Sequence, residues 1–361
     1  MAKKFFLPVF FIAIAIPTLA TAQYTAKILD NPAVTPYGSW AGGSNGTVQF
    51  GTKLSAPFPA TTPAHAILWS GTSASAVDLN PVGYSSSIGV DVAGNQQVGY
   101  AYQNGGAQAM LWFGTAASAV SLNPTGFANC FASRTDGTQQ VGEGYQNGIL
   151  TAMLWSGSAA SFVNLMPAGY ASSAAKGVDN GTQVGYAALS GTFPQQAFAW
   201  QGTAASAFNL HPAGYDYSQA NAVSGTQIVG YGGEASTASP HALLWDGFTN
   251  SATNLHASWL EWDYAWGTNG TVQVGYGYAN NVSHAVVWSG TSASAIDLNA
   301  FVPGTTNARA LGVDEFGNIV GYAELNGRNR AVMWTPVPEP STLAIFGLIG
   351  AGVAARRRRK N

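Results

Sequence analysis

Short apolar segments of four to six residues alternate along this chain with turns rich in glycine and asparagine. The clearest segment, residues 108–112, has near-copies that end in seven tryptophans: Trp69, Trp112, Trp155, Trp200, Trp245, Trp288 and Trp334. Successive tryptophans are 43, 43, 45, 45, 43 and 46 residues apart. Apolar runs bounded by Asn-Gly and Asp-Gly are typical of β-strands joined in hairpins, and no sustained helical period appears. The pattern predicts a repetitive all-β protein.

Each repeat carries four such segments in a fixed order. A small-residue segment comes first, as at residues 87–91, and Val-Gly-Tyr follows, as at 98–100. The tryptophan segment is third, and an Asp-Leu-Asn segment is fourth, as at residues 78–80 of the preceding repeat. Four short strands every 43 to 46 residues are the signature of a propeller blade, so seven units predict a seven-bladed β-propeller of four-stranded blades. We expect each tryptophan to pack between neighbouring blades. We expect the glycine of Val-Gly-Tyr to let adjacent sheets approach one another.

The phase of the repeat predicts how the ring closes. The chain enters the repeats with a fourth-strand segment, residues 27–30, and leaves them with a third-strand segment, residues 331–334. If the small-residue segment is the innermost strand, the last blade lacks its outer strand. Residues 24–30 would then complete that blade, pair beside residues 331–334 and leave no open sheet edge.

The repeated motifs resemble the HAF repeats of bacterial extracellular proteins. The best matches are His-Ala-x-Leu-Trp at residues 65–69 and 241–245, and His-Ala-Val-Val-Trp at 284–288. Other units depart from the first position of this motif, with Gln108, Thr151, Gln196 and Arg330. The resemblance covers almost all of residues 23–336. It implies a β-propeller and carries no assigned enzymatic activity.

The N-terminal residues predict export. Lys3 and Lys4 precede an apolar run at residues 5–16, Pro17 interrupts it, and Ala20-Thr21-Ala22 follows. A basic head, a short apolar core and an Ala-x-Ala site are typical of a secretory signal peptide, so we expect signal peptidase to remove residues 1–22. The alternative is a membrane anchor, for which the run is short against the roughly 30 Å that a helix must span.

The C-terminal residues 337–361 predict sorting. Pro338, Glu339 and Pro340 are followed by an apolar run at residues 343–355, expected to form a hydrophobic transmembrane helix, and by an arginine cluster. This order is closely similar to the PEP-CTERM sorting signal. The resemblance implies a Gram-negative bacterium that makes exopolysaccharide, and a membrane-embedded exosortase that cuts near Pro-Glu-Pro. It implies transient inner-membrane anchoring before delivery to the outer surface or extracellular matrix. An ordinary tail anchor is the alternative.

Charge argues against nucleic acid as a partner. Charged residues are 8% of the chain, and residues 23–337 carry 15 acidic and 7 basic side chains, a formal charge of −8. A region with net negative charge lacks the positively charged surface that attracts the phosphate backbone of a nucleic acid. The single cysteine, Cys130, cannot form an internal disulfide, and we interpret it as a small buried apolar residue.

The sequence predicts no catalytic residue, metal site or cofactor. His65, His241 and His284 share one repeat position on three different units, which indicates a structural role rather than converging ligands. Aspartates beside glycine or asparagine, such as Asp91 and Asp179, are typical of turns. No phosphate-binding loop, nucleophile elbow or zinc motif occurs.

Aromatic residues predict the only candidate binding site. A Pro-x-Gly-aromatic loop recurs with Tyr84, Tyr170 and Tyr215, and the sixth unit breaks the pattern with an aromatic cluster: Trp259, Trp262, Tyr264 and Trp266. These rings would either stack on sugars or fill gaps between blades. Three functions are therefore open. The first is an exported, non-enzymatic surface or matrix protein associated with exopolysaccharide, the second a lectin-like propeller, and the third a polysaccharide-degrading enzyme.

Overall fold

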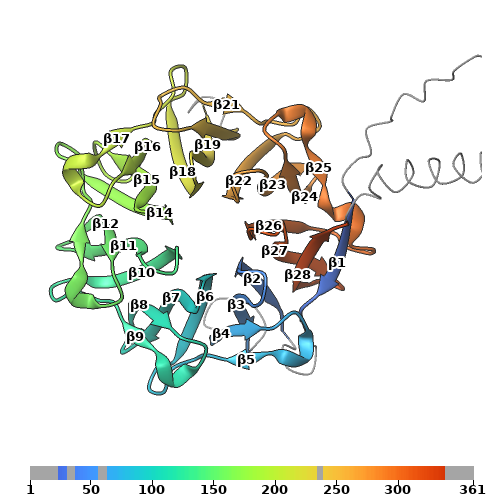
Figure 1. The fold of residues 1–361 in the computed structure, drawn as a ribbon, viewed down its shortest axis with the longest axis horizontal. Coiled ribbons are helices and arrows are strands. Elements are labelled where there is room, and N and C mark those ends of the chain that lie inside the picture. The colour runs from blue at the N-terminus through green and yellow to red at the C-terminus, as the bar shows by residue number, and fades with distance from the viewer. Residues whose placement is uncertain (1–22, 31–36, 56–62, 234–238, 338–361) are drawn as a thin grey trace, which may run out of the picture. The chain divides into compact units, whose positions relative to one another are not determined.

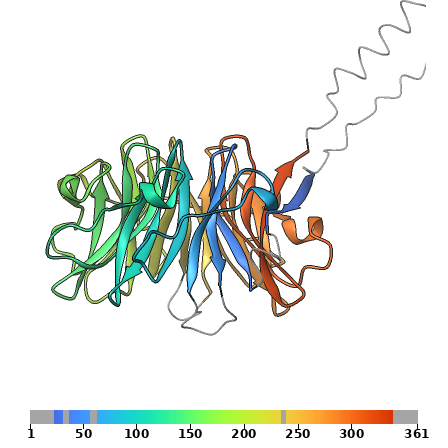
Figure 2. The same cartoon turned by 90° about the horizontal axis from the view of Figure 1, so that it is seen from below.

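The computed structural model describes residues 23–30, 37–55, 63–233 and 239–337. Residues 25–335 form one compact unit of seven four-stranded antiparallel sheets arranged in a ring (Figure 1). The strands of each sheet run between the two faces of the ring (Figure 2). This confirms the predicted seven-bladed β-propeller of four-stranded blades.

The strands have the order expected from the repeats, with the small-residue segment innermost (Figure 1). The inner strands are β2 (Ser39–Ser44), β6 (Ser86–Ala93), β10 (Ala128–Thr135), β14 (Ser172–Asp179), β18 (Tyr217–Ser224), β22 (Trp262–Thr268) and β26 (Ala308–Val313). The second strands are β3 (Gln49–Leu54), β7 (Gln96–Gln103), β11 (Gln140–Gln146), β15 (Thr182–Ala188), β19 (Gln227–Gly233), β23 (Gln273–Ala279) and β27 (Ile319–Leu325). We number the blades 1 to 7 in this order.

The two outer strands of each blade are shorter on average. The third strands are β4 (Ala64–Trp69), β8 (Gly106–Trp112), β12 (Ile149–Trp155), β16 (Gln195–Trp200), β20 (His241–Asp246), β24 (Val282–Trp288) and β28 (Arg328–Pro336). The fourth strands are β5 (Val77–Asp78), β9 (Val120–Ser121), β13 (Val163–Asn164), β17 (Phe208–Asn209), β21 (Thr253–Asn254), β25 (Ile296–Asp297) and β1 (Tyr24–Ile28).

Helical structure in the described residues is limited to six 3-10 turns. They are η1 (Ser73–Ser75), η2 (Ala116–Ser118), η3 (Ala159–Ser161), η4 (Ala204–Ser206), η5 (Ser292–Ser294) and η6 (Leu298–Phe301). Within these same residues no helix has the length and apolar character needed to cross a bilayer. The predicted signal peptide at 1–22, the motif residues Pro338, Glu339 and Pro340, and the predicted C-terminal helix all lie outside the described residues.

The N-terminal strand closes the ring, as predicted. Blade 7 has the strand order β1-β28-β27-β26, so its outer strand comes from the opposite end of the chain (Figure 1). The amide of Leu29 donates to the carbonyl of Ala331 at 2.8 Å, and the Leu29 side chain is fully buried. Asp30 forms an ion pair with Arg330 beside this strand. The edge of β28 is therefore paired and protected from association with other chains.

The seven repeated tryptophans pack as flat, buried rings between neighbouring blades. Each has no exposed surface. Trp112 of blade 2, for example, packs against Phe50, Ala66 and Leu68 of blade 1. Burying rings of this size removes roughly 150–250 Å² from water at each joint, so these residues supply a large share of the apolar burial. The prediction for these residues is confirmed.

The repeated glycine lies close to the inner strand of its own blade. A Cβ atom on Gly185 would lie 2.0 Å from the carbonyl oxygen of Ala174, on the inner strand of the same blade. The same clash, at 1.9 to 2.0 Å, recurs in the other six blades. Each inner strand shifts register by one residue directly after this point, and the bulge pushes its backbone towards the glycine. A Cβ atom at this position would thus meet the inner strand of its own blade first, a contact that the sequence did not predict.

Polar side chains complete the joints between blades. The amide of the alanine three residues before the repeated tryptophan points to the next blade. At most joints a serine of the inner strand accepts its hydrogen bond, as Ser87 does from Ala66 at 2.9 Å. At the joint between blades 5 and 6 Asp263 takes the place of this serine and accepts the bond. Two other joints have no acceptor on the inner strand, because Cys130 and Ala308 stand at this position. There an asparagine accepts instead, and the pairs are Ala109 with Asn123 at 2.8 Å and Ala285 with Asn299 at 3.0 Å.

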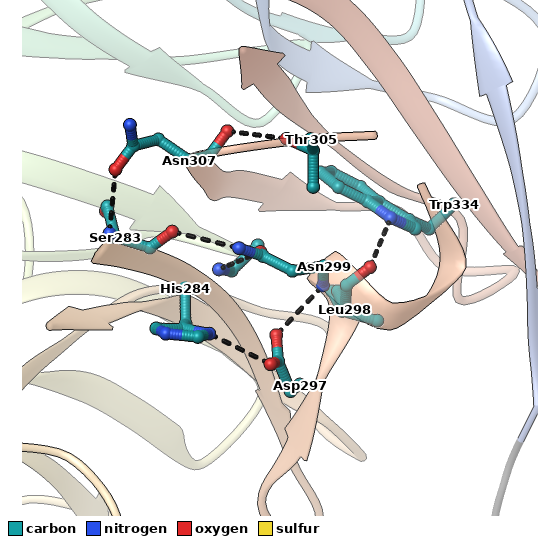
Figure 3. Close-up of polar contacts among 9 residues, drawn as sticks. Ser283, His284, Asp297, Leu298, Asn299, Thr305, Asn307 and Trp334 are labelled. Carbon is teal, nitrogen blue, oxygen red and sulfur yellow. Dashed lines mark hydrogen bonds and ion pairs between the residues drawn. The ribbon is translucent and has the colours of Figure 1, made fainter. Parts of the chain in front are cut away.

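The joint between blades 6 and 7 shows this arrangement in full (Figure 3). Asn299 also donates to the carbonyl of Ser283, and the Trp334 indole donates to the carbonyl of Leu298 at 3.1 Å. Asn307 of blade 7 accepts from the amide of Ser283 at 2.9 Å. The backbone of each blade is thus tied to its neighbour by side chains as well as by apolar packing.

Candidate functional site

Three of the predicted aromatic residues lie together on the inner strand of blade 6. Trp262, Tyr264 and Trp266 are partly exposed, and they alternate with the fully buried Asp263 and Ala265. Side chains two apart along a strand share a face, so the three rings line one side of β22. The side chains on the other face belong to the joint with blade 5, where Asp263 accepts from the amide of Ala242 at 2.7 Å.

These rings belong to a longer set of touching rings, which we call the aromatic tract: Phe193, Tyr217, Tyr231, Trp262, Tyr264, Trp266, Tyr276 and Tyr278. Neighbouring ring centroids along the tract are 4.6 to 6.4 Å apart. Trp262 stacks on Tyr278 at 5.1 Å with an angle of 5° between the planes. Phe193 is 53% exposed, whereas Tyr276 is buried. The tract joins blades 4, 5 and 6.

Burial raises the pKa of two phenols of the tract, those of Tyr231 and Tyr264. Burial, followed by the neighbouring Tyr276, raises the pKa of Tyr264 to about 12. Burial also raises the pKa of Tyr231, whose hydroxyl donates to Gln219 at 3.1 Å. At neutral pH these hydroxyls remain protonated and can both donate and accept hydrogen bonds.

Charged side chains accompany the aromatic residues on the inner strands. Lys176 on β14 forms an ion pair with Glu143 at 2.7 Å. Arg134 on β10 donates to the carbonyl of Leu311 on β26 at 3.2 Å. Blades 3 and 7 are not neighbours, so this hydrogen bond crosses the space at the centre of the ring.

A cavity of about 390 Å³ opens at the end of the inner strands where they turn into the second strands. Residues of all seven blades line it, including Arg134. Its aspartates tie one blade to the next: Asp91 accepts from the amide of Thr135, and Asp179 accepts from the amide of Gly225 at 2.7 Å. Among the described residues no group of three or more His, Cys, Asp or Glu side chains is placed to hold a metal ion.

Trp259 lies apart from the tract. It is 40% exposed and meets the ring of His284 edge-on at 5.3 Å. His284 in turn pairs with Asp297 of its own blade at 2.9 Å (Figure 3). His65 pairs with Asp78 in the same way, at 2.7 Å in blade 1. The equivalent histidines therefore act within separate blades.

The loop tyrosines also lie apart from the tract. Tyr84, Tyr170 and Tyr215 are partly buried and pack against three different clusters between blades. The hydroxyl of Tyr84 donates to Gln108 at 2.9 Å, and that of Tyr170 donates to Gln196 at 3.0 Å. Tyr215 lines a second cavity of about 550 Å³ together with His241, Asn254 and Glu261, at the opposite end of the inner strands from the first. The structure thus brings together only three of the seven predicted residues.

Sequence reasoning missed most of the aromatic tract. Tyr231 and Tyr276 are the tyrosines of the repeated Val-Gly-Tyr segment, which we interpreted only through its glycine. Their recurrence at Tyr100, Tyr186 and Tyr322 was a visible signal, because the same strand position carries a large ring in five of the seven repeats. Phe193 lies in a loop outside the repeated motifs, and no sequence pattern pointed to it.

The C-terminal segment of the chain matches a known family. Residues 336–360 match the PEP-CTERM protein-sorting motif. The motif marks an exported protein that is anchored transiently in a membrane and processed by exosortase, a membrane protease.

Several solved structures have a similar fold. TolB from Acinetobacter baumannii has a TM-score of 0.52 at 14% identity, over 85% of this chain and 70% of that chain. The β-propeller domain of the Trilobed protease from Pyrococcus furiosus has a TM-score of 0.56 at 10% identity, over 82% and 93%. Pyrococcus horikoshii acylaminoacyl peptidase has a TM-score of 0.55 at 9% identity, over 88% and 55%. Identities this low show the fold alone. No curated protein matches this chain in sequence.

Proposed function

We propose that this exported propeller is a non-enzymatic glycan-binding protein of the outer surface or extracellular matrix of a Gram-negative bacterium. In this proposal signal peptidase removes residues 1–22, the seven units are HAF repeats, and the ligand is exopolysaccharide. The aromatic tract carries the proposal. Six of its eight rings are at least partly exposed, and the rings pack against one another continuously over three blades. Such rings offer sugars a flat apolar face with polar edges. Stacked rings lose little conformational freedom on binding.

A binding role is supported over hydrolysis by the use of the carboxylates. A glycosidase needs two carboxyl groups roughly 5 to 10 Å apart in a substrate cleft, free to exchange protons. In the cavity of about 390 Å³ that all seven blades line, Asp91, Asp179 and Asp314 accept hydrogen bonds from the neighbouring blade. These carboxylates tie neighbouring blades together, which suits structural aspartates better than an acid and base pair.

The test is binding of the exported full-length protein to polysaccharides in affinity electrophoresis. Replacing Trp262 with alanine should weaken binding at least tenfold, because Trp262 is partly exposed and packs against Tyr264, Tyr276 and Tyr278 of the tract. Phe113→Ala is the matched control, since Phe113 is 42% exposed and lies outside the tract. Unfolding temperatures of both variants show whether the fold persists.

Three outcomes are distinguishable. Loss of binding only in Trp262→Ala supports the proposal. Equal binding by both variants, or no binding to any polysaccharide, refutes the assignment of the aromatic tract as a glycan site. A steady fall in polysaccharide viscosity on incubation would favour the polysaccharide-degrading enzyme instead.

A further inference from the structure

One cation on the inner strands is held against the aromatic tract. Arg309 of β26 places its guanidinium carbon 4.2 Å from the ring centroid of Tyr276 and 6.0 Å from that of Tyr322. Tyr276 itself stacks on Trp266 at 6.2 Å with 9° between the planes. A guanidinium over an aromatic face is attracted by the electrons of the ring. Arg309 therefore has a defined position at the blade 7 end of the tract.

The hydrogen-bonding capacity of Arg309 is largely unused. Its Nε atom donates to the hydroxyl of Ser283 at 3.4 Å, and its two terminal nitrogens donate to no group among the described residues. No described carboxylate lies within 4.0 Å of it to form an ion pair. A fixed guanidinium with free terminal donors matches a carboxylate, which it can bind through two parallel hydrogen bonds.

The other two inner-strand cations are already occupied. Lys176 is neutralised by Glu143, and Arg134 donates to backbone carbonyls. The inner strands nevertheless hold three of the seven basic residues of a body whose formal charge is −8. The same strands also carry Asp91, Asp179 and Asp263, so the attraction for an anionic ligand comes from the guanidinium of Arg309 itself and not from a local excess of positive charge.

We propose that Arg309 and the adjacent rings of the aromatic tract form a subsite for an acidic sugar, so that the ligand is a carboxylated, uronate-type polysaccharide. This inference rests on the proposed glycan-binding function and names its ligand class. The rings stack on the sugar, and Arg309 binds its carboxylate. Sulfated sugars present the same charge with a different geometry, and they serve as a separate arm of the test.

The experiment compares one acidic polysaccharide with its carboxyl-reduced form, which keeps the backbone sugars and removes the charge. Wild-type protein should bind the acidic form about tenfold more tightly, as expected for a charge-assisted hydrogen-bonded pair. Arg309→Gln should abolish that preference and leave binding of the reduced form within about twofold. Arg309→Lys should retain part of the preference, because it keeps the charge but not the planar fork.

Lys27→Gln is the matched control. It removes the same charge from an exposed residue of the outermost strand β1, and it should leave the preference unchanged. A preference that survives in Arg309→Gln, or an equal loss in Lys27→Gln, overturns the inference while glycan binding stands. Tighter binding of a sulfated than of a carboxylated polymer also overturns the carboxylate assignment. If neither form binds to wild-type protein, the proposed function fails as well.

Discussion

At the residue scale, single substitutions between repeats are compensated by their neighbours. Ser87 and its equivalents accept a hydrogen bond from a buried backbone amide of the preceding blade. Where Cys130 or Ala308 removes that acceptor, Asn123 or Asn299 supplies another. An unsatisfied buried amide costs about 1–3 kcal/mol, so each joint has to retain one acceptor or the other.

This compensation predicts different effects for one substitution at two equivalent positions. Asn299→Met should lower the free energy of unfolding by about 1–3 kcal/mol, because the Ala285 amide loses its acceptor. Asn80→Met should cost less, because Ser87 serves that joint and Met166 already occupies the equivalent site in blade 3. Chemical denaturation measures both. Adding Ala308→Ser to Asn299→Met should restore stability, and equal losses at the two positions would contradict this account.

The buried tyrosines predict how stability depends on pH. Burial raises the pKa of Tyr264 and of Tyr100 to about 12, whereas an unfolded tyrosine ionises near pH 10. As pH rises above 10, the unfolded chain releases protons first, so the folded state loses stability between pH 10 and 12. Denaturation at pH 9, 10 and 11 should show this fall. A double variant with phenylalanine at both positions should show a smaller one, and an unchanged slope would argue against the effect.

At the element scale, the blade depends on a bulged inner strand lying over a glycine. The register shift after Ala175 brings the backbone of β14 within contact of Gly185, and only a residue without Cβ fits there. This explains why a glycine occupies the equivalent position in the second strand of each blade. These glycines have ordinary strand dihedral angles. The requirement is one of space rather than of backbone conformation.

The prediction at this scale is a pair of glycine substitutions. Gly185→Ala should destabilise the protein by at least about 3 kcal/mol, because its Cβ would lie 2.0 Å from a carbonyl oxygen. Gly106→Ala is the control, since the nearest atom to its Cβ would be 3.8 Å away in a similar strand. Thermal unfolding separates the two. Comparable midpoints for both variants would show that the inner strand can move aside.

At the scale of the whole molecule, the ring depends on a seam between the two ends of the repeat array. The N-terminal end contributes strand β1 to blade 7, and Leu29 and Asp30 after it also bind β28. Leu29 is fully buried in a cluster with Ala41, Trp69 and Ala331, which belong to blades 1 and 7. The first and last blades are thus bound to each other by apolar contacts as well as by strand pairing.

Removing residues 23–30 from the mature chain should therefore have two effects. The loss of buried Leu29 alone should cost roughly 2–5 kcal/mol, and the uncovered edge of β28 should promote association between molecules. Thermal unfolding and light scattering after size exclusion measure these effects. The control is Lys27→Ala, which alters an exposed residue and keeps the strand. A truncated protein that stays monomeric with an unchanged midpoint would show that the seam is dispensable.

The blades, their number, the tryptophans between them and the closing strand could all be predicted from the sequence. They depend on contacts within one repeat or between adjacent repeats. Because the same contacts recur seven times, the residues that make them form a pattern that is recognisable in the sequence. The buried state of Cys130 followed from the same logic, because its position in the repeat is that of a small inner-strand residue.

The tertiary structure alone decided which side chains meet at the inner strands. Phe193 and Trp262 belong to different blades, and Arg134 reaches Leu311 across the ring. Such contacts depend on how blades are placed around a common axis, which local periodicity does not encode. For the same reason the sequence identified the broken sixth repeat but not its partners. Trp262, Tyr264 and Trp266 became a candidate site only when the ring set them beside the tyrosines of the neighbouring strands and Arg309.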